Sequence, residues 1–141
     1  MSGGSSSATT NLSLTAGRSC RCMTYGIAKR LEVTRLWNQG ITGRGIFVGV
    51  VGTGIDRQHH DLDDKVVASK DFSTRGIQDH IGHDTAVASI VAGKGAKNWR
   101  MRGIAYEAKL AVAKVTQDDG SAEEDILIDA LEWLASQGVH A

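Results

Sequence analysis

The segment from Ile46 to Asp56 constrains the fold of this chain more than any other part of the sequence. It begins with a run of uncharged, mostly apolar residues and continues into the closely spaced Gly52 and Gly54. Such a run is typical of a strand buried on both faces of a parallel sheet. Glycine permits a positive φ or a close approach of two backbone segments. Because ligands of open α/β sheets bind beyond the carboxyl ends of the strands, the turn after this strand is where we expect a functional site.

The remaining segments predict an alternation of helices and strands around this central strand. A loose helical pattern ends near Gly40. Strands are then expected at 65–72 and 108–115, helices at 83–92 and 121–137, and the start of a last strand at 139–141. Ser121 and Glu124 have the spacing of a capping box at the start of the last helix. The alternation predicts an α/β fold with three layers, in which a parallel sheet is flanked by helices.

Composition sets the domain boundaries and excludes several classes of protein. Residues 1–24 are rich in Ser, Thr and Gly, which predicts a disordered leader before a folded domain at 25–141. The 16 basic and 16 acidic residues balance, which argues against nucleic acid and membrane as partners. Met1 to Thr10 show no secretory signal, so the compartment stays open. Cys20 and Cys22 are too few for a zinc site.

Four segments, in this order and with plausible spacing, resemble motifs of one enzyme family. They are Trp37 to Gly45 (WNQGITGRG), Val48 to Leu62 (VGVVGTGIDRQHHDL), Gly82 to Gly93 (GHDTAVASIVAG) and Gly103 to Ser121. The chain is similar over 25–141 to the N-terminal half of the subtilisin-like serine proteases, the subtilase family. This resemblance implies a truncated subtilisin-like fold and, for the parent enzyme, hydrolysis of peptide bonds through an acyl-enzyme.

The resemblance assigns the working residues by position. His83 falls on the catalytic histidine, which takes the proton of the serine nucleophile and later gives it to the leaving amine. The catalytic aspartate of the family falls on Gly52, which offers no carboxylate. Asp84 follows His83, and we expect it to be a poor substitute because adjacent residues on a helix do not face each other. Restoring aspartate at position 52 is therefore expected to test the site.

The other assignments concern the nucleophile, the substrate and a metal. The sequence contains no G-T-S-M-A type block, so the chain alone is predicted to be inactive. Gly120, Ser121 and Ala122 fall where the family pairs an edge strand with a peptide or protein substrate. No cofactor is required, but the family often binds calcium through an aspartate that matches Asp61, which is otherwise a solvated loop carboxylate.

Three other interpretations remain open at this stage. The chain could be a non-catalytic pseudoprotease relic that binds peptides or a partner. The cluster of His59, His60, Asp61, Asp79, His80, His83 and Asp84 could belong to an all-helical metal phosphohydrolase, although the ligands lack helical spacing. Gly52 and Gly54 are half of a dinucleotide fingerprint, whose third glycine is replaced by Arg57. The missing C-terminal half of the domain, or self-association through an exposed sheet edge, is expected to cover the apolar surface that remains.

Overall fold

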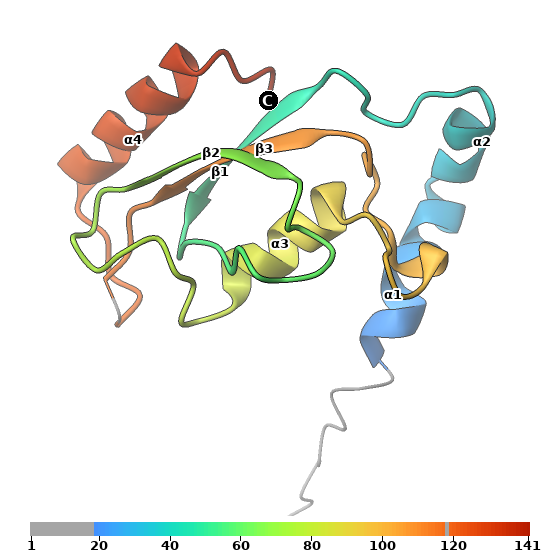
Figure 1. Cartoon of the computed structure of the whole chain (residues 1–141), viewed down its shortest axis with the longest axis horizontal. Coiled ribbons are helices and arrows are strands. Elements are labelled where there is room, and N and C mark those ends of the chain that lie inside the picture. The colour runs from blue at the N-terminus through green and yellow to red at the C-terminus, as the bar shows by residue number, and fades with distance from the viewer. Residues whose placement is uncertain (1–18, 118) are drawn as a thin grey trace, which may run out of the picture.

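The computed structural model describes residues 19–117 and 119–141, with side chains from residue 25 onward (Figure 1). Its elements are α1 (Ser19–Arg30), α2 (Val33–Asn38), β1 (Phe47–Gly52), β2 (Val66–Asp71), α3 (His83–Ala92), a 3-10 turn η1 (Trp99–Met101), β3 (Lys109–Lys114) and α4 (Glu124–Ser136). Most of the predicted leader lies outside the described residues, but α1 includes residues 19–24 of it. The order of helices and strands agrees with the sequence prediction.

The three strands form one parallel sheet with the order β1-β3-β2. β3 therefore lies between the other two strands, and it pairs with β1 along its whole length, from Phe47 with Lys109 to Gly52 with Lys114. Among these three strands, β3 is the middle one. On the other side of β1, His140 N donates to Phe47 O at 2.7 Å and Gly49 N donates to Ala141 O at 2.7 Å. The predicted start of a further strand thus pairs with β1.

The alternation of side chains along β3 explains why the fold has three layers. Leu110 and Val112 are fully buried in a cluster that includes Ala88 of α3. Ala111 and Ala113 are fully buried in a second cluster that includes Leu134 of α4. Because successive residues of a strand point to opposite faces, the two helices must cover opposite faces of the sheet, as Figure 1 shows. The predicted three-layer α/β fold is confirmed, and an all-helical fold is excluded.

The start of α4 differs from the prediction. The helix begins at Glu124, and its N-cap residue Glu123 makes no side-chain capping hydrogen bond. Ser121 does not form the expected capping box, because it lies two residues before the N-cap residue; its hydroxyl instead donates to Asp119 Oδ1 at 2.6 Å. Glu124 and Asp125 still place negative charge in the first turn, where the helix dipole favours it.

No helix among the described residues is both long enough and apolar enough to cross a membrane.

Candidate functional site

The turn after β1 packs directly against the loop that leads into α3. Gly54 has a φ of 107°, and a Cβ added there would lie 2.4 Å from the carbonyl oxygen of Ile77. Ile55 N donates to the same oxygen at 2.9 Å. Only glycine allows this close approach, as expected from the sequence. The contact fixes the position of the α3 N-terminus relative to the carboxyl end of β1.

Asp79 holds the start of α3 in place. One of its carboxylate oxygens accepts from Gly82 N at 2.7 Å, and the other accepts from Thr85 N at 2.9 Å and from the Thr85 hydroxyl at 2.7 Å. Burial by itself would raise the pKa of the Asp79 carboxyl, but the hydrogen bonds from Thr85 and Gly82 outweigh it and hold this pKa below its ordinary value. This role was not predicted from the sequence, because Asp79 lies three residues before the N-cap residue Gly82, outside the position where aspartate is a capping signal.

Two further hydrogen bonds join α3 to the turn after β1. Asp84 N donates to the hydroxyl oxygen of Thr53 at 3.1 Å, and Asp56 N donates to that of Thr85 at 3.0 Å. His83, the first residue of α3, therefore lies at the carboxyl end of the sheet with its side chain exposed. An accessible imidazole in this place can exchange protons with a bound substrate or nucleophile.

The structure brings together Gly52 and Asp84, which the sequence analysis treated as unrelated departures from the family pattern. A Cβ built on Gly52 would lie 2.7 Å from each carboxylate oxygen of Asp84. Asp84 is only 3% exposed. Adjacency to His83 on the helix does not decide where this carboxylate points, because the Asp84 side chain reaches across to the strand. No signal in the sequence indicates a contact between residues 32 positions apart.

The predicted substrate segment is an exposed loop. Gly120, Ser121 and Ala122 belong to no strand, and Gly120 has a φ of 82°. Gln117 N donates to Ser121 O at 2.8 Å, which closes a tight turn ahead of α4. Gly120 N also donates to Gln117 O at 2.9 Å, and Ser121 N donates to Asp119 Oδ1 at 2.9 Å, so these groups already have partners within the loop. Peptide binding by these three residues remains a prediction.

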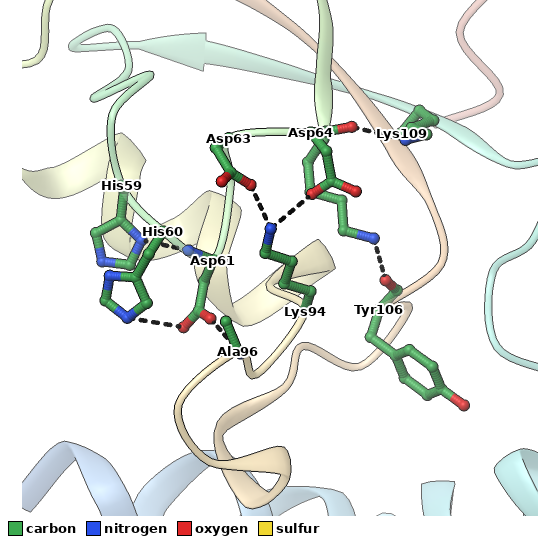
Figure 2. Close-up of polar contacts among 10 residues, drawn as sticks. His59, His60, Asp61, Asp63, Asp64, Lys94, Ala96, Tyr106 and Lys109 are labelled. Atoms are coloured by element: carbon green, nitrogen blue, oxygen red, sulfur yellow. Dashed lines mark hydrogen bonds and ion pairs between the residues drawn. The ribbon is translucent and has the colours of Figure 1, made fainter.

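Asp61 is buried in the loop between β1 and β2, and is not a solvated loop carboxylate. It is 7% exposed, and its Oδ1 accepts from Ala96 N at 2.7 Å. Its Oδ2 lies 4.0 Å from His60 Nε2. Figure 2 shows these contacts beside Lys94, which bridges the carboxylates of Asp63 and Asp64. Asp61 therefore ties its own loop to residues 94–96, and this structural role needs no metal.

The surroundings of Asp61 do not fit a calcium site. Calcium takes about six to eight oxygen ligands. Asp61 shares the nearest pocket with His60, Lys97, Asn98 and Met101, which add a cation and no second carboxylate. Among the described residues, no group of three or more His, Cys, Asp or Glu could hold a metal ion.

Calcium is accordingly expected to leave the stability of the chain unchanged. A ligand that binds the folded state raises the midpoint of thermal unfolding, so the midpoint in millimolar calcium should equal that in chelator. Magnesium at the same concentration controls for ionic strength. A rise seen with calcium alone, and abolished by Asp61→Asn, would contradict this expectation.

Comparisons with known proteins agree with the motifs and the fold. The family model described as "Subtilase family" matches residues 43–141. Similar curated proteins include the "Major intracellular serine protease" of Bacillus subtilis (strain 168), 30% identical over 79% of this chain and 37% of that protein. Subtilisin E of the same organism is 33% identical over 82% of this chain and 30% of its own length. Subtilisin Savinase of Lederbergia lenta is 34% identical over 82% of this chain and 42% of its own length.

A solved structure shares the fold. It is titled "Structure of the Clostridium Perfringens CspB protease" and matches with a TM-score of 0.72 at 24% identity, over 80% of this chain and 30% of that chain. The similarity supports the parallel three-layer arrangement. The chain spans well under half the length of each of these relatives.

Proposed function

We propose a function from the premise that this chain belongs to the subtilase family: it is the histidine-bearing part of a serine endopeptidase domain and hydrolyses no peptide by itself. The observation that carries the proposal is His83, exposed at the first residue of α3 where this helix meets the turn after β1. His83 would act as the base that takes the proton of a serine nucleophile and returns it to the leaving amine.

The proposed inactivity of the chain alone follows from the catalytic groups that acyl transfer requires. Acyl transfer needs a nucleophile that the base activates, and residues 1–141 contain no G-T-S-M-A type block. The serine and the oxyanion donors would have to come from a further polypeptide segment. In that assembly the backbone of Gly120, Ser121 and Ala122 would pair with an extended peptide substrate.

A serine-directed fluorophosphonate tests the proposed inactivity. We expect the 141-residue chain to show no covalent labelling and no turnover of a peptide substrate, because a base without a nucleophile forms no acyl-enzyme. Subtilisin Savinase, treated in parallel, provides the positive control. His83→Ala provides the matched negative control. Labelling of the chain that disappears in His83→Ala would contradict the proposal.

A second candidate is a non-catalytic module that binds a peptide or a partner protein. It is favoured by the exposed apolar side chains of α4, where Leu127, Ile128 and Leu131 are 39%, 48% and 52% exposed. The reading frame after residue 141 separates the two candidates. A serine block in frame would support the enzyme, whereas a stop codon would favour the binding module.

A further inference from the structure

We propose that Asp84 supplies the carboxylate of the candidate site from α3, in the space left by the missing side chain of Gly52, and that it positions the imidazole of His83. The inference rests on the proposed function of His83 and goes beyond it, because it names a residue that the family pattern does not provide. It also gives Gly52 a role, because the absence of a side chain at position 52 leaves room for the Asp84 carboxylate.

The first observation behind this proposal is the close approach of the Asp84 carboxylate to Gly52. A Cβ at this position would meet both Asp84 oxygens at 2.7 Å and its Cγ at 3.0 Å. Contacts under about 3 Å are closer than van der Waals packing allows. A side chain at residue 52 would therefore displace the Asp84 carboxylate from its present place, and the φ of Gly52, 158°, would add backbone strain.

The second observation is that the Asp84 carboxylate is buried. Asp84 is 3% exposed, and its Oδ2 is buried without a hydrogen-bond partner in the part of the chain that the structure describes. Burial raises the pKa of the Asp84 carboxyl above its ordinary value, and the amides of Thr53 and Gly54 and the charge of the nearby His83 oppose that rise. A buried acceptor with no partner costs stability, which is expected of a functional group.

The position of this acceptor defines the role. Asp84 follows His83 at the N-terminus of α3, and its carboxylate lies at the carboxyl end of β1. A carboxylate that accepts the N–H of an imidazole fixes the ring in one tautomer and stabilises its cationic form. The His83 side chain is exposed in this structure, so the ring would have to turn inward for Asp84 Oδ2 to accept its N–H, and Asp84 would then be a positioning residue for the base.

A double-mutant cycle on the 141-residue chain tests the spatial exchange. Gly52→Asp is expected to lower the midpoint of thermal unfolding by roughly 5 °C or more, because two carboxylates would compete for one space. Asp84→Gly removes the competitor, so Gly52→Asp with Asp84→Gly should recover the steric part of that loss, whereas the strain of a side chain at the φ of Gly52, 158°, remains. If Gly52→Asp prevents folding, Gly52→Ala with the same partner substitution makes the measurement with a milder contact. Additive effects in the cycle would overturn the exchange.

The spectrum of the His83 ring tests the positioning role, with a readout that a merely structural role would not move. In chain labelled with ¹⁵N-histidine, the His83 ring nitrogens, assigned through His83→Gln, report the ratio of neutral tautomers. One tautomer should dominate in the parent chain, and Asp84→Asn should shift the ratio by several-fold, whereas Asp63→Asn should not. Gly52→Asp with Asp84→Gly should restore the original ratio. A ratio that Asp84→Asn leaves unchanged would overturn the role.

These measurements need no turnover, so they are independent of the fluorophosphonate experiment. A chain that labels with the probe would contradict its proposed inactivity and leave the exchange between residues 52 and 84 standing.

Discussion

Gly54→Ala is expected to destabilise the chain by about 2–5 kcal/mol, as the sum of backbone strain and a steric overlap. Its φ of 107° is unfavourable for any residue with a Cβ. The added Cβ would also lie 2.4 Å from Ile77 O and 3.2 Å from the carbonyl carbon of Gln78. Both atoms are backbone, so neither can move aside by a change of rotamer. The loop before α3 would have to shift, and the acceptor of the Ile55 amide would shift with it.

Gly76→Ala separates the two contributions. Gly76 also has a positive φ, 84°, but a Cβ added there has no atom within 4 Å. Its replacement should therefore cost only the backbone strain, about 1–2 kcal/mol. Urea unfolding followed by circular dichroism gives both free energies. Equal losses in the two variants would show that the contact between Gly54 and Ile77 has no energetic weight.

Local sequence patterns were sufficient to predict most elements of this fold. The alanine-rich run that ends at Gly93 predicted a helix at 83–92, and α3 has these bounds. The apolar run at 108–115 predicted the strand observed at Lys109–Lys114. The helix is marked by the glycine that ends it, and the strand is marked by apolar residues that are buried on both faces of the sheet. Both causes act on residues that are neighbours in the sequence. They can therefore be inferred from a single sequence.

Features that depend on contacts through space could not be inferred in this way. The apolar character of β1 and β3 is alike, so the sequence could not show that β3 lies in the middle. Ser121 and Glu124 have the spacing of a capping box, but the helix begins only at Glu124, so Ser121 lies before the N-cap. At the candidate site, His83 was assigned through a motif, whereas the approach of Asp84 to Gly52 requires the packing of α3 against β1. The sequence predicted the residue types of the site and missed one of its contacts.

Asp79→Ala is expected to cost about 2–3 kcal/mol at neutral pH, since it removes charge-assisted hydrogen bonds from a buried site. Asp79 is 8% exposed and accepts from Gly82 N, Thr85 N and the Thr85 hydroxyl. Without the carboxylate these donors are left unpaired at the start of α3, next to His83. Asp63→Ala is the matched control, because Asp63 is half-exposed and forms a surface ion pair with Lys94, so its loss should be much smaller. Similar losses in urea unfolding would contradict the anchoring role of Asp79.

The pH dependence of stability provides an independent test of Asp79. Its pKa in the folded chain lies below the ordinary value, despite the opposing effect of burial, because Thr85 and Gly82 donate to the charged form. The stabilisation is therefore fully present above the pKa of the unfolded chain, about 3.9, and is lost as the pH falls through the lower folded value. Asp79→Asn removes this titration and keeps the shape of the side chain. The difference in unfolding free energy between the parent chain and Asp79→Asn should be constant near neutral pH and shrink below about pH 4. Taking this difference cancels the titration of other carboxylates, including Asp71 and Asp84. If the difference in unfolding free energy stays constant down to pH 2, the charge on Asp79 does not anchor α3.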